Sequence, residues 1–400
     1  MLRDGTTRLL RTINRSAVLE LVRENSPISR SQIAKQLNIS LPTVMRIVDD
    51  LMAERLVRQS DLRDTTKGRP ASFIEFNGEA FAIVGVDLGG TKIYGMVADL
   101  AGNIQYSLYR THEENQANSA GDYLDGLCEF IEELLAAPRP SGQQIRGIGV
   151  GAPGVTLVPE GIVTWAPSLN WRDLPLQAIL TDHFDMPVTV ENDVNLAALG
   201  EWGFGVGKGA CSMVAITLGT GIGAGIIIDG SIYRGCNQAA GEVGYMLPAP
   251  RFLAQRYEGF GALETLASGT GIARRAHELL EERQLPFPEE RLDARYVFAQ
   301  AELSVEWAQQ VVDETVDYLA LAIANISTVL DPEMIVLGGG VASNNPSRLL
   351  IDPIRQRLEG VIPFIPHLEL SELGREAAVM GAIMHVMKAT DEYVVVKQLT

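Results

Sequence analysis

A glycine-rich turn behind an apolar segment constrains the fold of this chain most strongly. Residues 82–86 predict a buried strand, and Asp87, Gly89 and Gly90 follow at its end. Paired glycines let the backbone turn with its N–H groups exposed, which suits phosphate oxygens. A dinucleotide fold or a P-loop would open a helix here, but residues 92–99 alternate and are rich in strand formers. The pattern predicts a hairpin that either binds phosphate or is an ordinary Gly-Gly turn.

A second copy of this arrangement lies in the middle of the chain. Residues 213–218 predict a strand, 219–221 is a Gly-Thr-Gly turn, and 222–228 predicts the next strand. A third glycine turn, 338–340, follows the strand 335–337 and opens toward a helix. Two such hairpins in a pseudo-duplicated chain predict an α/β fold with two facing lobes and a nucleotide between them. This plan is similar to the actin/hexokinase-type (ribonuclease H-like) superfold.

The composition predicts a large aliphatic core and a cytoplasmic protein. Hydrophobic residues make up 46% of the 400 residues and aromatic residues only 6%. The charged N-terminus has no apolar run behind it, so no signal peptide is expected. The longest uncharged stretch, 209–228, contains glycines and threonines that make it a poor membrane-spanning helix. Cys128, Cys211 and Cys236 have neither metal nor redox spacing, which is typical of a reducing compartment.

Charge is divided unevenly along the chain. The net charge of −17 by itself argues against binding to nucleic acid. Residues 1–80 hold 13 Lys and Arg against 10 Asp and Glu, a balance of +3, whereas the remainder holds 20 (33 − 13) against 40 (50 − 10), a balance of −20. Only the N-terminal segment is therefore expected to approach DNA, and the acidic remainder is expected to be repelled by it.

The N-terminal segment has the pattern of a helix-turn-helix. Apolar residues between 13 and 24 fall on one helical face. Ser29 and Gln32 have the spacing of a capping box at the start of a second helix, 30–37. Ser40 is placed to cap a third helix, whose apolar residues repeat at the spacing of one buried face. Helix, short helix, turn and helix is the order of that motif.

The third helix and the segment after it carry the candidate DNA-binding residues. The start of this helix is where a recognition helix meets base edges. Two short strands, 56–59 and 72–76, flank a polar loop, 61–70, which predicts a wing whose basic, proline-stiffened end could enter a minor groove. A helical bundle that binds only protein is the alternative. The predicted DNA-binding residues are Ser40, Pro42, Thr43, Arg46, Lys67, Gly68 and Arg69.

These motifs together resemble the ROK family (repressors, open reading frames, kinases). In the N-terminal part the resemblance rests on residues 14–16, 28–30, 43–44 and 68–70, and in the remainder on the glycine turns. It implies a winged helix-turn-helix domain at 1–77, a first lobe at 82–200 and a second lobe at 201–390. The implied nucleotide-binding residues are Asp87, Gly89, Gly90, Thr91, Lys92, Gly219, Thr220, Gly221, Gly339 and Gly340.

The resemblance also implies a sugar site in the cleft. Asp193 follows the strand 187–190 and would take the proton from the sugar hydroxyl that attacks the γ-phosphate. Alternatively, Asp193 only caps its helix. Two tryptophans flank Asn170, and their rings either hold a sugar or plug a loop; the carboxylates of the second lobe either bind sugar or are solvated charges. The implied sugar-binding residues are Asn170, Asn192, Asp193, Glu242, Tyr245 and Glu264.

The chain departs from the family pattern at one place. The family has Gly-Glu-x-Gly-His followed by cysteines that bind structural zinc, whereas this chain has Tyr245 in place of the histidine and neither His nor Cys in 241–264. Zinc needs several thiolate or imidazole ligands, so no zinc or other metal is expected. The loop 248–260 is expected to be fixed by packing, with Phe252 and Tyr257 as candidates.

Two functions fit these features. The first is a sugar-responsive transcriptional regulator, foremost a repressor, that binds operator DNA without a cofactor and a monosaccharide or sugar derivative in its cleft. A homodimer or higher homo-oligomer is expected because helix-turn-helix proteins often read two-fold operators; no membrane partner is expected. The second is a sugar kinase that uses ATP and Mg²⁺, with Asp193 as base. A kinase does not need a winged helix, so the sequence favours the regulator and leaves residual kinase activity open.

Overall fold

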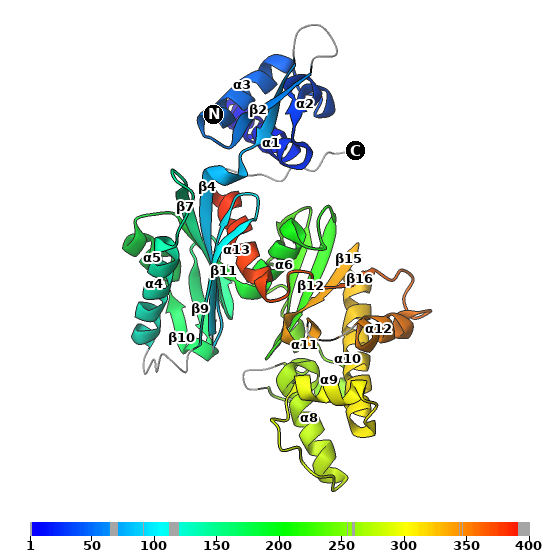
Figure 1. Ribbon diagram of the computed structural model, residues 1–400. Coiled ribbons are helices and arrows are strands. Elements are labelled where there is room, and N and C mark those ends of the chain that lie inside the picture. The colour runs from blue at the N-terminus through cyan, green and yellow to red at the C-terminus, as the bar shows by residue number, and fades with distance from the viewer. Residues whose placement is uncertain are drawn as a thin grey trace.

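The computed structural model describes residues 2–64, 71–90, 92–111, 120–253, 255–257, 261–343, 345 and 347–390. Figure 1 shows a small N-terminal unit, here called the head (residues 2–76), above two lobes that lie on either side of helix α13 (Ala377–Thr390). Among the predicted site residues, Thr91 and the wing residues Lys67, Gly68 and Arg69 lie outside the described residues.

The head consists of three helices and a small antiparallel sheet. The capping box is confirmed, because the Ser29 side chain accepts a bond from the Gln32 backbone and the Gln32 side chain accepts one from the Ser29 backbone. Ser40 caps α3 by accepting from the Thr43 backbone. The elements are α1 (Leu2–Asn25), β1 (Ile28–Ser29), α2 (Arg30–Gln36), α3 (Leu41–Ala53), β2 (Val57–Asp64) and β3 (Ala71–Phe76).

Two boundaries in the head differ from the sequence-based prediction. Helix α1 begins at Leu2 rather than near residue 13. Strand β2 continues to Asp64, so the wing loop begins later than residue 61. The reason is an irregularity in the ladder between Gln59 and Arg63, after which β2 pairs with β3 again. A β-bulge of this kind has no clear pattern in a polar sequence, so the continuation of β2 could not be predicted.

Lobe I is built on a five-stranded sheet in the order β11-β7-β4-β5-β6. Its central strand β4 pairs antiparallel with β5 and parallel with β7. A smaller sheet of order β10-β9-β8 lies beside it. The elements are β4 (Phe81–Leu88), β5 (Lys92–Asp99), β6 (Ile104–Thr111), α4 (Ala120–Ala136), β7 (Gln144–Ala152), β8 (Val155–Leu157), β9 (Ile162–Ala166), β10 (Trp171–Leu174), α5 (Leu176–Phe184) and β11 (Val188–Asn192).

Lobe II repeats this plan in the order β14-β13-β12-β15-β16, which confirms the pseudo-duplication. Its central strand β12 pairs antiparallel with β13 and parallel with β15. Helix α9 lies in a charged segment for which the sequence analysis predicted no helix or strand, and Asp293 caps it. The elements are α6 (Asp193–Phe204), β12 (Ser212–Leu218), β13 (Ile222–Ile228), β14 (Ser231–Ile232), α7 (Glu264–Ala267), α8 (Gly269–Glu282), α9 (Ala294–Glu302), α10 (Glu306–Leu330), β15 (Met334–Gly338), α11 (Gly339–Ala342), α12 (Ile351–Leu358) and β16 (His367–Leu370).

Helices α6 and α13 cross in direct backbone contact between the lobes (Figure 1). A Cβ atom on Gly381 would lie 1.7 Å from the carbonyl oxygen of Leu196, and one on Gly200 would lie 2.0 Å from that of Ala377. Only glycine permits so close a crossing. The predicted boundary between residues 200 and 201 falls inside α6, and α13 packs on β4 and β7 of lobe I.

The head and lobe I share one hydrophobic cluster. Val18 and Val22 of α1 belong to the same cluster as Met96 of β5 and Val386 and Met387 of α13. Lobe II has its own large core, beneath α8, α9, α10 and α12. No helix in the described part of the chain is both long enough and apolar enough to cross a membrane.

Candidate functional site

The first glycine turn is closed by its own backbone. Gly89 N–H donates to the carbonyl of Lys92 at 2.8 Å, and the Tyr123 hydroxyl donates to the carbonyl of Gly89 at 3.3 Å. A Cβ atom on Gly90 would lie 2.8 Å from Cβ of Ser168, so the turn packs against the loop that carries Asn170. The Gly89 N–H predicted to face phosphate is therefore already used in the hairpin.

Asp87 lies just before this turn and is half-buried. Burial raises the pKa of its carboxyl from 3.8 to about 6, although the charge of Lys92 acts in the opposite direction. Removing a carboxylate from water without a full complement of partners disfavours its ionised form. Asp87 is thus placed to receive a cation or a hydrogen-bond donor from a bound ligand.

The second glycine turn faces more open space. Gly219 N–H donates to the carbonyl of Gly221 at 2.9 Å, and the carbonyl of Gly219 accepts from Gly269 N–H at 2.8 Å. A Cβ atom on Gly219 would have Gly221 O, at 4.0 Å, as its nearest neighbour, and one on Gly340 would meet nothing within 4 Å. Gly339 has φ +82°, which favours glycine. Room at Gly219 and Gly340 fits a phosphate-bearing group.

Asp193 is the first residue of α6, and Asn192, not Asp193, caps that helix. The Asn192 side chain accepts from Asn195 N–H at 3.0 Å and donates to the Gly154 carbonyl at 2.8 Å and to Asp193 Oδ1 at 3.1 Å. Asp193 Oδ1 also accepts from Val194 N–H at 2.9 Å. The alternative that Asp193 serves as the cap is therefore wrong, and the Asn192 amide is engaged within the protein.

The Asp193 carboxyl lies in an acidic neighbourhood. Burial, and then the charges of Asp87 and Glu242, raise its pKa from 3.8 to about 8 against the effect of its backbone hydrogen bonds. At neutral pH most of this group is therefore protonated and can donate a hydrogen bond. Three carboxyl groups from both lobes thus act on one another, as expected of a site closed around a polyhydroxyl ligand.

Glu242, Tyr245 and Glu264 form the lobe II side of this neighbourhood. Glu264 Oε2 accepts from Ile222 N–H at 2.9 Å, next to the second glycine turn. Burial raises the pKa of Glu264 and that of Glu242. Tyr245 is 47% exposed, and its pKa is raised by burial and by both glutamates. The residue that replaces the family histidine therefore borders the carboxyl groups, with nearly half its surface free.

Of the two alternatives for the tryptophan rings, the structure supports packing rather than sugar contact for Trp171. Its side chain is 3% exposed and meets the Tyr123 ring edge-on, with centroids 5.2 Å apart. Pairing of β10 with β9 places Trp171 opposite Ala166 and turns the ring into the lobe I core. Trp165 is 41% exposed and Asn170 is exposed, with φ +54°. One tryptophan, not two, is left to meet a ligand beside Asn170.

A buried ion pair that the sequence analysis missed supports this side of the cleft. Glu191 is 1% exposed, and its carboxylate pairs with Arg234 at 2.5 Å. Its other oxygen accepts from Asn195 Nδ2 at 3.1 Å and Asn192 N–H at 2.9 Å. A glutamate directly after the apolar strand predicted at 187–190 was the available signal. The pair fixes the strand end from which Asp193 projects.

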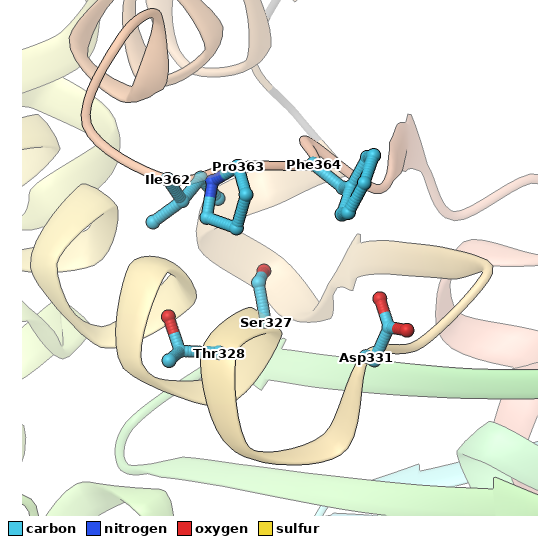
Figure 2. A pocket seen from close by; sticks show the side chains of 6 residues that line it. All are labelled: Ser327, Thr328, Asp331, Ile362, Pro363 and Phe364. Atoms are coloured by element: carbon cyan, nitrogen blue, oxygen red, sulfur yellow. The ribbon is translucent and has the colours of Figure 1, made fainter.

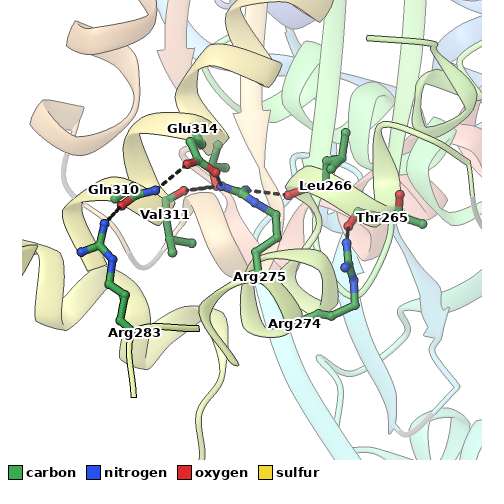
Figure 3. Close-up of polar contacts among 9 residues, drawn as sticks. Thr265, Leu266, Arg274, Arg275, Arg283, Gln310, Val311 and Glu314 are labelled. Atoms are coloured by element: carbon green, nitrogen blue, oxygen red, sulfur yellow. Dashed lines mark hydrogen bonds and ion pairs between the residues drawn. The ribbon is translucent and has the colours of Figure 1, made fainter. Parts of the chain in front are cut away.

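Arg275 is a second positioning residue that the sequence analysis missed (Figure 3). It donates to the Leu266 carbonyl at 2.9 Å, to Thr315 Oγ1 at 3.1 Å and to Glu314 at 2.6 Å. These bonds tie the α7–α8 junction to α10. Because α7 begins with Glu264 and α8 with Gly269, the network holds both beside the second turn.

The loop after Tyr245 is held partly as expected. Phe252 is 8% exposed and confirms the predicted packing, with the Arg251 guanidinium 4.9 Å from its ring centre. The Tyr257 hydroxyl donates to Gln255 Oε1 at 2.8 Å, a hydrogen bond within the loop itself. Within the described residues, no group of three or more His, Cys, Asp and Glu side chains could hold a metal ion.

A pocket of about 210 Å³ lies away from these turns, at the end of α10 (Figure 2). None of the predicted site residues lines it. Its walls are Ser327, Thr328, Asp331, Ile362, Pro363 and Phe364. It is therefore separate from the carboxyl groups of Asp87, Asp193 and Glu242.

In the head, the predicted DNA-binding residues divide into two groups. Ser40 Oγ and Thr43 Oγ1 are hydrogen-bonded at 2.7 Å and are used in the helix cap. Pro42 and Arg46 are exposed on α3. The second pair is therefore free to meet DNA.

Known proteins match the chain in both parts. The model of the ROK family matches residues 83–389, and the model of a winged helix-turn-helix DNA-binding domain matches residues 11–58. This chain belongs to the ROK family. A glucokinase of Halalkalibacterium halodurans is 38% identical over 74% of this chain and 92% of its own length. A putative xylose repressor of Caldicellulosiruptor sp. is 29% identical over 98% of this chain and 100% of its own length.

A solved structure covers the head and both lobes together. It is described as a ROK family transcriptional regulator, a homolog of the E. coli MLC protein. The TM-score is 0.80 at 23% identity, over 96% of this chain and 98% of that one. At this identity the likeness shows the fold, a winged head on a ROK body.

Proposed function

We propose that this protein is a sugar-responsive DNA-binding regulator that represses genes of carbohydrate metabolism. One observation carries the proposal: the putative xylose repressor aligns with 98% of this chain, head included, whereas the glucokinase aligns with 74%. A kinase accounts for the lobes alone, and a repressor accounts for the whole chain. Such a regulator acts in the cytoplasm.

The proposed effector is a monosaccharide or sugar derivative bound between the lobes. Asp193 and Glu264 are half-buried and Glu242 is exposed, so all three carboxyl groups can exchange hydrogen bonds with sugar hydroxyls, and exposed Trp165 can cover a ring face. We include Tyr245 and Asn170 as edge contacts. Asn192 acts by holding Asp193 and Gly154 rather than by binding sugar directly, because its amide is already hydrogen-bonded.

The proposed response is a change in lobe closure. The head shares a hydrophobic core with lobe I. A sugar that draws lobe II toward lobe I would therefore change the position of lobe II relative to the head. Coupling between two sites is typically about 1–3 kcal/mol, or roughly 5–150-fold in affinity. We propose a homodimer or higher homo-oligomer, because one head reads only half of a two-fold operator.

The test is a gel shift with DNA from upstream of the protein's own gene. We expect binding that one monosaccharide of a panel including xylose and glucose relieves. Glu242→Gln should bind the same DNA but lose the sugar response, while Glu333→Gln, far from the carboxyl group cluster and next to Cys211, should keep it. A full sugar response in Glu242→Gln would contradict the proposed site, and an absence of DNA binding at low salt would contradict the regulator.

A sugar kinase is the second candidate, and the 38% identity to a glucokinase favours it. Asp87, Gly219, Thr220, Gly339 and Gly340 would hold ATP with Mg²⁺, which would neutralise charge on the transferred phosphate. As a base, Asp193 must be ionised, yet its pKa is about 8. An ATP-coupled assay on the same sugars, with Asp193→Asn as the inactive control, tests this activity.

A further inference from the structure

Helix α3 presents an apolar strip on the face that the head leaves uncovered. Leu41 is 44% exposed and Met45, one turn later, is 48% exposed. Residues four apart on a helix lie side by side, so the two side chains form a continuous surface. Such a surface has a more favourable free energy when a partner covers it. The adjacent face of the helix is buried through Val44, Ile47, Val48 and Leu51.

The acidic side chains of α3 and its C-cap are each paired with an arginine of another helix. An exposed ion pair contributes little to stability, but it removes a local negative charge. In this case the helix loses the charge that would repel a polyanion, in a head whose balance is already +3 over residues 1–80. The pairs are Asp49 with Arg30 at 3.3 Å, Asp50 with Arg11 at 3.0 Å, and Glu54 with Arg15 at 2.7 Å.

We infer that α3 reads its operator half-site through thymine methyl groups, with Leu41 and Met45 as the contacting side chains and Arg46 on a neighbouring guanine. Thymine alone displays a methyl group in the major groove, and apolar side chains recognise it by contact. Arginine donates two hydrogen bonds to guanine O6 and N7. The inference rests on the proposed function, because it requires operator binding.

The position of the strip on the helix supports this occupant. Leu41 is the first residue of α3 and Met45 the fifth, and the N-terminal turns of a recognition helix are the part that meets base edges. Methionine is unbranched and adapts to irregular surfaces, which suits a methyl group in a groove. Arg46 is also exposed, so the uncovered side of the helix carries an apolar and a cationic side chain.

The test removes one methyl group at a time from the DNA. Each thymine of the operator is replaced by deoxyuridine, which lacks only the 5-methyl group, and affinity is measured by fluorescence anisotropy. We expect one or two positions in each half-site to weaken wild-type binding about fourfold, as follows from roughly 0.8 kcal/mol per buried methylene and 1.4 kcal/mol per factor of ten. Leu41→Ala and Met45→Ala should each lose the deoxyuridine penalty at one position.

Controls separate this inference from the proposed function. Leu303→Ala changes a leucine that is 72% exposed on lobe II and should keep the complete deoxyuridine profile. Equal thermal melting of all variants and unchanged affinity for non-specific DNA would show intact heads. A flat profile in the wild type, penalties that persist in both α3 variants, or a change of oligomeric state in place of the penalty would overturn the inference while operator binding stands. If the wild type binds no DNA, the regulator itself is overturned.

Discussion

The two lobes share one sheet plan but are joined to the head in different ways. Lobe I is fused to the head, because α1 shares a hydrophobic cluster with β5 and α13. The guanidinium groups of Arg55 in the head and Arg146 in β7 also contact the Phe81 ring of β4, at 5.6 Å and 4.8 Å from the ring centre. Lobe II packs on α13 through α6, across a crossing of glycines.

A second contact joins lobe II to the end of α13 that lies nearest the head. Lys388 donates to the Gly230 carbonyl at 2.5 Å, and its ammonium group is 4.6 Å from the centre of the Trp202 ring. Burial lowers the pKa of Lys388 to about 8, and the charges of Glu20 and Arg23 in the head also act on it. The comparison teaches that head and lobe I form one unit, against which lobe II is expected to move.

The largest effect is expected where the lobes cross. In Gly381→Val the new Cβ atom would lie 1.7 Å from the Leu196 carbonyl oxygen, and neither backbone can yield without separating α6 from α13. Overpacking typically costs about 1–3 kcal/mol, and a clash with backbone should exceed that range. Urea denaturation should show a much lower midpoint. Ala389→Val, at an exposed position on the same helix, should leave the midpoint nearly unchanged.

The fusion of head and lobe I can be broken at Met387, which is 5% exposed in their shared cluster. Met387→Ala should lower stability by about 2–5 kcal/mol, because it removes buried atoms and leaves a cavity. Hydrogen exchange should accelerate in the head as well as in lobe I. Leu319→Ala, in the separate core of lobe II, should accelerate exchange there and spare the head. Equal protection of the head in both variants would mean that it is an independent unit.

The acidic cleft should make stability depend on pH. The folded state raises the pKa of Asp193 from 3.8 to about 8, so it holds a proton that the unfolded chain releases. The stabilisation that this proton gives is fully present below the unfolded pKa of 3.8 and is lost as the pH rises through the folded pKa of about 8. Burial lowers the pKa of His385 from 6.5 to about 4 and that of Lys388 from 10.5 to about 8. Both groups change stability with the opposite sign, and they do so outside the range of pH 6.5–8.

Urea midpoints at four pH values between 6.5 and 8 test this dependence. The free energy of unfolding of the wild type should fall by up to about 1.4 kcal/mol per pH unit, as expected when folding binds one additional proton. Asp193→Asn should flatten the slope, whereas Asp331→Asn, at an exposed helix end, should retain it. Parallel slopes in wild type and Asp193→Asn would remove Asp193 as the cause.

The smallest effect is expected at the contact between lobe II and the end of α13. Lys388→Met keeps an apolar stem beside Trp202 but loses the bond to Gly230 and the charge near Glu20. Operator affinity without sugar should change little, and the sugar response should fall a few-fold, within the roughly 1–3 kcal/mol of typical coupling. Lys208→Met, at an exposed position, is the matched control. An unchanged sugar response in Lys388→Met would show that this contact does not contribute to the response.

Local patterns in the sequence predicted most elements and the family. The capping box at Ser29 and the turn at Gly219 depend on neighbours within a few residues, so spacing alone revealed them. Helix α9 was missed because its buried residues, Val297 and Phe298, stand in a charged segment. Trp171 was misassigned because only its pairing with β9 decides which way the ring points.

By itself, the sequence determined that this chain has a helix-turn-helix and two glycine hairpins, because a turn or a cap requires particular residues at fixed spacing. The tertiary structure decided that α13, at the far end of the chain, lies between the lobes and closes a common core with α1. It also decided that Asn192 rather than Asp193 caps α6, which leaves the Asp193 carboxyl close to those of Asp87 and Glu242. Burial and charge at one residue depend on segments distant in sequence, and no local pattern records them.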